Sequence, residues 1–174
     1  RFLPVEIKNY HEPFVGGGAV ALHIIRTRNP NKVILSDLNE ELINCYNMIQ
    51  NNVEEIIKLL KIYKQKHNEA FYYKLRSQDA TKLSQVKRAA RFIYLNKTCF
   101  NGLYRVNSKG EFNVPIGRYT NPGIVQEDEL RAIAHLLKSV KIKCVPFEGI
   151  VDYATKGDFV YFDPPYYPVS KTAS

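Results

Sequence analysis

Four residues toward the carboxyl end of the sequence have types and spacing suited to chemistry on an amino group. Asp163, Pro164, Pro165 and Tyr166 follow an apolar run at 159–162, which has the composition of a central parallel strand covered on both faces. Open α/β sheets bind their ligands outside the carboxyl ends of the strands. Two successive prolines fix the backbone and remove two N–H donors, so nearby carbonyls stay free to accept hydrogen bonds from a substrate.

Such a group could activate a weakly nucleophilic amine. The lone pair of an amine on an aromatic ring is delocalised into the ring. Hydrogen bonds from its N–H groups to Asp163 and to a rigid carbonyl would favour tetrahedral geometry and stabilise positive charge developing on nitrogen. Tyr166 would add a ring face for stacking a flat base. The alternative interpretation is a rigid turn after a strand, with an exposed tyrosine.

Three glycines near the amino end could bring a ligand close to the backbone. Gly16, Gly17 and Gly18 follow a predicted strand at 10–15 and precede a predicted helix at 19–25. Glycine permits close approach, and the first turn of a helix offers free N–H groups. The spacing differs from that of the dinucleotide fingerprint, so both a nucleoside cofactor and a plain tight turn stay open.

The position of Asp37 suits an acid that binds a ribose. Asp37 ends a predicted strand at 32–36, 19 residues after Gly18, and could accept hydrogen bonds from two ribose hydroxyls. The alternative role is to cap the following helix. Together with the glycines, Asp37 favours a ribose.

The elements that must position these residues follow α/β order. Strand, glycine loop, helix, strand and acid form the first unit of a doubly wound α/β fold with a right-handed crossover. A helix is predicted at 39–48. The alternation resumes late in the sequence with a helix at 128–138 and strands at 140–145 and 159–162.

The intervening sequence has a different character. Apolar residues at helical spacing predict helices at 53–63 and 86–95, and turn residues at 96–122 predict a hairpin and loops. We therefore expect residues 1–52 and 123–174 to form one α/β domain, and 53–122 to form an inserted helical and β-hairpin region.

Charge is concentrated in that insert. Between Lys58 and Arg118 there are 14 Lys and Arg against three acids, whereas the remainder has 11 basic and 14 acidic residues. A basic block on a near-neutral body indicates a surface for a polyanion, although such a face can also be merely solvated. Because this basic block coincides with the inserted region, nucleic acid is the favoured polyanion.

Composition excludes several classes of protein. The chain of 174 residues is 45% hydrophobic and 24% charged, as in ordinary globular domains, and it has no apolar run of membrane-spanning length. Three widely spaced cysteines do not form a disulfide scaffold, and we expect a cytoplasmic protein. The four histidines share no metal-ligand spacing, so no metal site is expected.

Several motifs in order resemble the Dam family of DNA adenine N6-methyltransferases, and are most similar to GATC-modifying members of DpnII-type restriction-modification systems. The likeness covers nearly the whole chain. The Asp-Pro-Pro-Tyr motif alone is shared with methyltransferases acting on RNA and protein amides. The matching segments are Glu-Pro-Phe-Val-Gly-Gly-Gly at 12–18, Ser-Asp-Leu-Asn at 36–39, Asn-Gly-Leu-Tyr-Arg at 101–105, Gly-Glu-Phe-Asn-Val-Pro-Ile-Gly-Arg-Tyr at 110–119, and Asp-Pro-Pro-Tyr at 163–166.

The resemblance implies a Rossmann-like class I methyltransferase sheet, S-adenosyl-L-methionine as methyl donor, and a flipped adenine in double-stranded DNA as acceptor. It implies that Asp163 and the carbonyl of Pro164, in the rigid turn with Pro165, hold the adenine amine while Tyr166 stacks on the ring. The implied cofactor-binding residues are Pro13, Phe14, Gly16, Gly17, Gly18, Asp37, Phe147 and Asp163. The implied DNA-binding residues are Phe100, Asn101, Leu103, Arg105, Pro115, Arg118 and Tyr119.

Within this set, Phe100 would wedge into the duplex, Leu103 and Pro115 would make apolar base contacts, and Arg105 would read a guanine. Core packing is the alternative for Phe100 and Leu103. The resemblance also implies a paired restriction endonuclease and a catalytic domain that continues beyond both ends of this sequence. A DNA-binding relative without catalysis, and an enzyme acting on RNA or a protein amide, are the alternative functions.

Overall fold

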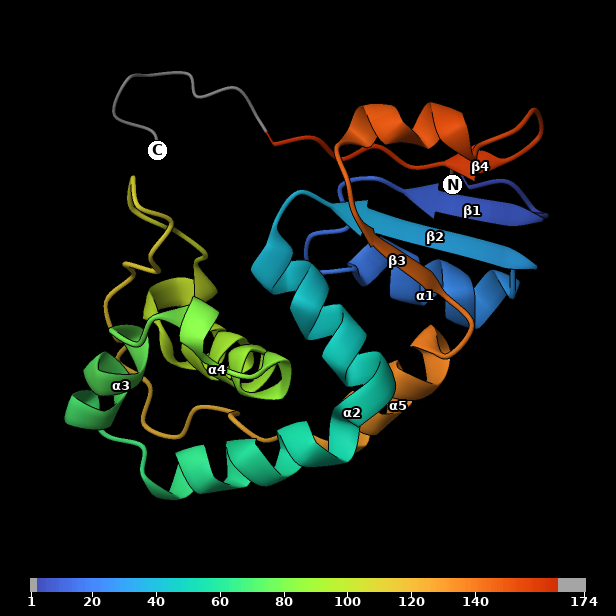
Figure 1. Cartoon of the computed structure of the whole chain (residues 1–174). Helices are drawn as coiled ribbons and strands as arrows, with labels where there is room; N and C mark the ends of the chain where they lie inside the picture. Colours follow the sequence, from blue (N-terminus) through green and yellow to red (C-terminus); the bar gives the residue numbers. More distant parts are fainter. Residues whose placement is uncertain (1–2, 166–174) are drawn as a thin grey trace. The chain divides into compact units, whose positions relative to one another are not determined.

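A computed structural model describes residues 3–165 of the chain (Figure 1). Two compact units make up this structure. Residues 39–138 form one of them, and the segments before and after form the other, which contains the sheet. Tyr166, which we expect to stack on the target base, lies outside the described residues.

The sheet has four parallel strands in the order β3-β2-β1-β4. Their bounds are Asn9–Glu12 for β1, Lys32–Asp37 for β2, Lys141–Cys144 for β3 and Phe159–Val160 for β4. The chain moves outward from β1 to β3 and then returns to the other side of β1, which is the order of a doubly wound sheet. The predicted α/β fold class is confirmed.

Two strands differ from their predictions. β1 ends at Glu12 rather than at residue 15, because Pro13 has no N–H group with which to continue the ladder. The run at 159–162 was predicted as a central strand covered on both faces, which is wrong for the described residues. β4 comprises only two half-buried residues and pairs only with β1 in this part of the chain, which leaves Phe162 exposed.

Helix α1, Ala19–Arg28, connects β1 to β2 and runs along one side of the sheet (Figure 1). Gly18 caps its amino end with a positive φ of 69°, a conformation that glycine adopts without strain. Ala21 and Ile24 of the helix are fully buried. A short helix, η3, Phe147–Asp152, follows β3.

A buried polar cluster ties β1 to the loop before β4. The side chain of Asp158 accepts hydrogen bonds from Asn9 Nδ2 at 2.7 Å and from the Thr155 N–H at 3.0 Å. Its Oδ2 also lies 2.8 Å from His11 Nε2. The bond from Asn9, followed by those from Thr155 and His11, holds the pKa of Asp158 well below its usual range. These bonds fix the position of the chain that enters β4.

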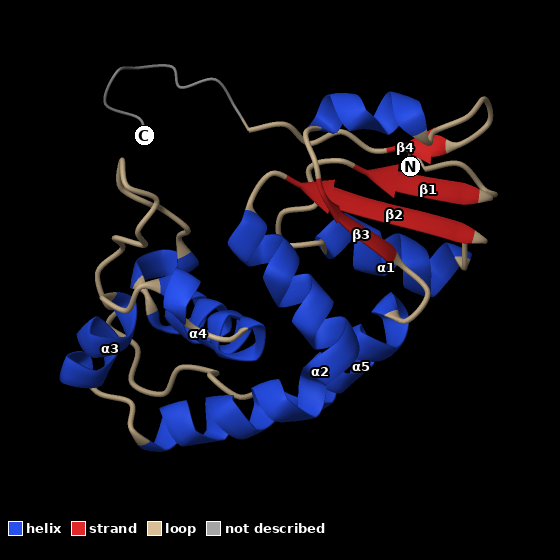
Figure 2. Cartoon of the chain, in the orientation of Figure 1, coloured by secondary structure: helices blue, strands red, loops and turns tan. Residues whose placement is uncertain are grey.

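The second unit is largely helical, whereas the strands belong to the first (Figure 2). Its helices are α2 at Glu40–Gln65, α3 at Glu69–Arg76, α4 at Gln85–Thr98 and α5 at Glu127–Leu137, with short turns η1 at Ala80–Lys82 and η2 at Phe100–Gly102. None of the helices among residues 3–165 has both the length and the apolar character to cross a membrane.

Helix α2 joins two segments that were predicted as separate helices. The backbone leaves helical geometry at Asn52 (φ −137°, ψ 32°) and then resumes, so one element carries both. The predicted limits of the insert, 52/53 and 122/123, both fall inside the compact unit 39–138. The assignment of 53–122 to DNA recognition stays a prediction.

Inside this unit a buried arginine satisfies the end of a helix. Arg91 of α4 donates from Nε to the Leu75 carbonyl at 2.9 Å and from Nη2 to the Arg76 carbonyl at 2.7 Å. These carbonyls belong to the last turn of α3, where carbonyl groups have no N–H partner within the helix itself. The bonds hold α3 against α4 among buried Tyr72 and Tyr94.

Candidate active site and nucleic-acid interface

The predicted chemical groups of the first unit follow neighbouring strands at one edge of the sheet. The glycine loop follows β1, and Asp163 comes three residues after β4, which pairs with β1 in parallel. The Tyr161 N–H donates to the His11 carbonyl at 2.9 Å and extends this pairing toward Asp163. Strand order reverses between β1 and β4, and such a reversal opens the crevice where doubly wound sheets bind ligands.

The glycine loop is held in a defined turn next to Asp37. The Gly18 N–H donates to the Val15 carbonyl at 2.8 Å, and the Gly16 N–H donates to Asp37 Oδ2 at 3.2 Å. Gly16 has a positive φ of 46°. A Cβ built on exposed Gly17 would meet no described atom within 4 Å, so the space beside the loop is open to a ligand.

Asp37 does not cap the following helix, so the capping alternative is wrong. The cap of α2 is Asn39, whose Oδ1 accepts from the Leu42 N–H at 3.2 Å. The half-buried carboxylate of Asp37 stands at the carboxyl end of β2, facing the glycine loop through Gly16. This placement suits an acceptor for ribose hydroxyls.

Three phenylalanines gather beside the loop. The ring of Phe14 lies 5.3 Å from that of Phe147 in a stacked arrangement and 6.4 Å from that of Phe162, measured between centroids. Phe147 and Phe162 are exposed, whereas the neighbouring Pro13 is buried. An exposed aromatic group of this kind fits the flat base of a nucleoside. Sequence reasoning missed Phe162, although it is the last residue of an apolar run.

Asp163, Pro164 and Pro165 are all exposed, as a group that contacts substrate must be. The charge of Asp163 acts on Glu12, a residue that sequence reasoning did not assign to the site; Glu12 lies at the end of β1 and is only 3% exposed. Its Oε2 accepts from the hydroxyl of Tyr10 at 2.5 Å. Burial raises the pKa of Glu12 to about 7. The hydrogen bond from Tyr10, the second-largest effect, lowers this pKa, the charge of Asp163 raises it by less, and Ala21 lowers it slightly.

Replacing Glu12 by glutamine should change how stability depends on pH. The pKa of Glu12 is raised from 4.5 to about 7, so between these values the unfolded chain ionises more readily than the folded one. The free energy of unfolding therefore falls as pH rises through this interval, by about 3 kcal/mol from this group. Glu12→Gln should remove that fall in urea unfolding at pH 5 and pH 8. An unchanged difference between the two pH values would contradict it.

In the second unit, a hairpin follows α4, as predicted, but with two isolated antiparallel bridges rather than two full strands. The bridges pair Val106 with Phe112 and Cys99 with Ile116. The Asn113 N–H donates to the Arg105 carbonyl at 3.0 Å, which keeps the hairpin closed. Tyr72 of α3 anchors its return segment by donating to the Val114 carbonyl at 2.9 Å.

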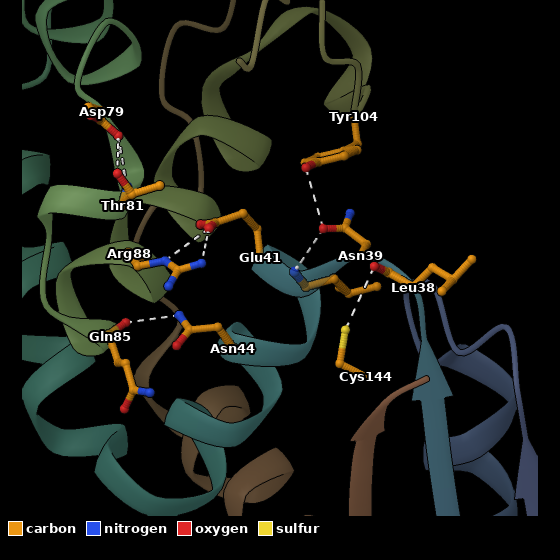
Figure 3. Close-up of polar contacts among 11 residues, drawn as sticks. Leu38, Asn39, Glu41, Asn44, Asp79, Thr81, Gln85, Arg88, Tyr104 and Cys144 are labelled. Atoms are coloured by element: carbon orange, nitrogen blue, oxygen red, sulfur yellow. Dashed lines mark hydrogen bonds and ion pairs between the residues drawn. The ribbon is translucent and has the colours of Figure 1, made fainter. Parts of the chain in front are cut away.

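One side of the hairpin base is held against helices of the same unit. The ring of Tyr104 lies 5.4 Å from that of Phe92, and its hydroxyl donates to Asn39 Oδ1 at 3.4 Å (Figure 3). Nearby, Arg88 of α4 forms an ion pair with Glu41 of α2 (Figure 3). The contacts of Tyr104 hold the hairpin base against α4 and the start of α2, and the ion pair joins these two helices.

The predicted DNA-binding side chains lie on the surface. Phe100 is 49% exposed and Leu103 is 50% exposed, so core packing is wrong for both. Asn101 occupies the left-handed region with φ 52°, in a turn that Asn96 Nδ2 holds by donating to the Gly102 carbonyl at 2.9 Å. The exposed members of the predicted set are Phe100, Asn101, Leu103, Arg105, Pro115, Arg118 and Tyr119.

Fold and site together define a Rossmann-like methyltransferase domain: a parallel sheet whose strand order reverses between a glycine loop and an exposed acid-proline-proline turn. Residues 1–174 match the D12 class N6 adenine-specific DNA methyltransferase family, and the chain belongs to this family. The predicted family is confirmed.

Similar proteins are found in archaea and bacteria. The chain is 49% identical to the Type II methyltransferase M.MjaIII of Methanocaldococcus jannaschii, over 97% of this chain and 62% of that protein. It is 44% identical to the Type II methyltransferase M1.LlaDCHI of Lactococcus lactis subsp. cremoris, over 99% and 61% of the respective lengths. It is 39% identical to the DNA adenine methylase of Haemophilus influenzae, over 92% of this chain and 55% of that protein. The chain thus spans about three-fifths of the length of these relatives.

Proposed function

We propose that the protein carrying this chain transfers a methyl group from S-adenosyl-L-methionine to N6 of a flipped adenine in double-stranded DNA, at GATC sites. The observation that carries the proposal is the exposed Asp163-Pro164-Pro165 turn, which follows the strand next to the one that leads into the glycine loop. Membership of an adenine-specific DNA methyltransferase family supports the same reaction.

The residues around the glycine loop fit the donor. Gly16 and Gly17 are exposed, and the space beside Gly17 is open to a ligand. Asp37 offers a carboxylate to the ribose hydroxyls of the donor, and Phe14 and Phe147 offer ring faces to its adenine base. When bound, S-adenosyl-L-methionine supplies an electrophilic methyl group, so that a C–N bond to the acceptor forms as the C–S bond breaks.

Asp163 and Pro164 are proposed to bind the amino group that accepts the methyl group. The amine would donate one N–H hydrogen bond to the Asp163 carboxylate and the other to the Pro164 carbonyl. These two bonds would orient the nitrogen lone pair and stabilise the positive charge that develops on nitrogen. The nitrogen then gives up one proton to water. Because N6 is buried in the duplex stack, the adenine must leave the helix before these groups can reach it.

The exposed residues at 100–119 are proposed to contact the duplex. They combine aromatic and apolar side chains with Arg105 and Arg118, within a block of 14 basic and three acidic residues. Positive charge attracts the phosphate backbone, whereas the guanidinium of Arg105 suits the two acceptors of a guanine. A DNA-binding function alone would need this surface but not an exposed acid-proline-proline turn.

Transfer of labelled methyl groups tests the proposal. We expect incorporation into a duplex containing GATC and none into a duplex with the same bases in scrambled order or into double-stranded RNA. Binding of the GATC duplex without incorporation would support the DNA-binding alternative, and label in RNA or protein would overturn the DNA substrate.

We also propose that the protein protects DNA from a restriction endonuclease that cleaves the same site. The Type II methyltransferase names of two similar proteins support this role. DNA methylated by the protein should resist an endonuclease that cuts unmodified GATC. Full cleavage of the methylated DNA would contradict the assignment of the site.

A further inference from the structure

We propose that Asn113 is a specificity-determining positioning residue: it holds Arg105 so that the two terminal nitrogens of the guanidinium, Nη1 and Nη2, face a guanine. The inference rests on the proposed function, in which Arg105 reads a base. Arg105 Nε donates to Asn113 Oδ1 at 2.8 Å. The two residues also pair through the backbone, because the Asn113 N–H donates to the Arg105 carbonyl at 3.0 Å.

The pairing in the hairpin places these side chains together. Arg105 and Asn113 stand opposite each other, next to the bridge between Val106 and Phe112. Side chains alternate between the two sides of an extended segment, so Tyr104 and Phe112 contact each other on one side while Arg105 and Asn113 bond on the other. The contact therefore follows from hairpin register and not from chance proximity on a surface.

The positive charge of Arg105 is not neutralised by an acid in the described part of the chain. In the described part of the chain, no carboxylate oxygen lies within 4.0 Å of its guanidinium. The acid nearest in the hairpin, Glu111, instead accepts from Asn107 Nδ2 at 2.8 Å. Asn113 supplies a neutral acceptor, which orients the arginine without cancelling its charge.

The geometry selects one way of reading guanine. A guanidinium can present two parallel N–H groups to O6 and N7 of guanine, either through Nε and one Nη or through both Nη atoms. With Nε bonded to Asn113, the two Nη atoms are left for the base. Fixing the planar group before binding also reduces the rotamer freedom lost on contact with DNA.

A double-mutant cycle between protein and DNA tests the inference. The guanine of GATC is replaced by 7-deazaguanine, which lacks the N7 acceptor, and kcat/KM is measured for each protein on each duplex. Loss of one of two hydrogen bonds should lower kcat/KM of the unaltered protein by about 10-fold. For Asn113→Ala the penalty should shrink to about 2–3-fold, because a mobile arginine no longer discriminates by geometry.

Asn113→Asp is the matched variant, since it keeps the acceptor for Arg105 Nε. It should restore the full 7-deazaguanine penalty, although its added charge weakens DNA binding at low salt. A merely structural role for Asn113 would lower activity on both duplexes equally and leave the penalty unchanged. That result, or failure of Asn113→Asp to restore the penalty, would overturn the inference.

The same cycle is measured by binding, using fluorescence anisotropy of labelled duplexes. A protein that binds GATC but transfers no methyl group would disprove the proposed reaction, while the binding penalties would still decide the role of Asn113. Far-ultraviolet circular dichroism verifies that each variant is folded.

Discussion

Replacing Asp163 by alanine is expected to lower the rate of methyl transfer by about 10²–10³-fold, the effect of removing one preorganised group that stabilises transition-state charge. The side chain is exposed and follows β4 rather than packing in the core, so its loss should leave the fold intact. Single-turnover transfer of labelled methyl groups to a GATC duplex measures the chemical step. Thermal unfolding measures the fold.

The matched control is Asp152→Ala, which removes an exposed acid from η3 in the same unit. This variant should retain the unaltered rate. Asp163→Asn keeps an acceptor oxygen but loses the charge, so its rate should fall between those of the unaltered protein and Asp163→Ala. Normal turnover by Asp163→Ala would disprove the role of this residue and with it the proposed site.

Replacing Arg105 by alanine is expected to relax discrimination at one guanine by about 1–3 kcal/mol. The guanidinium is exposed, has no ion-pair partner within 4.0 Å among residues 3–165, and is held at Nε by Asn113. Competition between GATC and duplexes altered at the guanine gives the ratio of kcat/KM values. The ratio should approach one only at the position that Arg105 reads.

Lys64→Ala provides the comparison for charge alone. This lysine lies in the last turn of α2, within the basic block, and any contact with phosphate should be independent of sequence. Its loss should reduce the salt dependence of binding and leave discrimination unchanged. If Arg105→Ala instead weakened binding to all duplexes equally, Arg105 would be a phosphate contact.

Local signals in the sequence predicted much of the sheet. The glycine loop and the strand ending at Asp37 could be found because turn residues and β-branched runs act over short distances. The bounds of β1 and the short extent of β4 among residues 3–165 could not, because strand pairing depends on partners distant in the chain. The break at Asn52 likewise interrupts α2 without ending it, and no local signal distinguishes these outcomes.

The same distinction applies to the site. Asp163 and Asp37 were found because each acid follows a predicted strand. Glu12 is the last residue of β1, but it lay inside the predicted strand at 10–15, so this signal did not single it out. Asn113 could not be found, because its contact with Arg105 depends on the register of the hairpin, which is visible only when Val106 and Phe112 are seen to pair.

The helical unit is one uninterrupted stretch, 39–138, between two strands that lie side by side, β2 and β3. The chain enters this helical unit once, after β2, and leaves it once, before β3. That stretch can be lengthened, shortened or exchanged while β1, β2 and β4, which position Glu12, Asp37 and Asp163, keep their pairing. Under the proposed function, the DNA sequence that is recognised could therefore change without any change in the residues that transfer the methyl group.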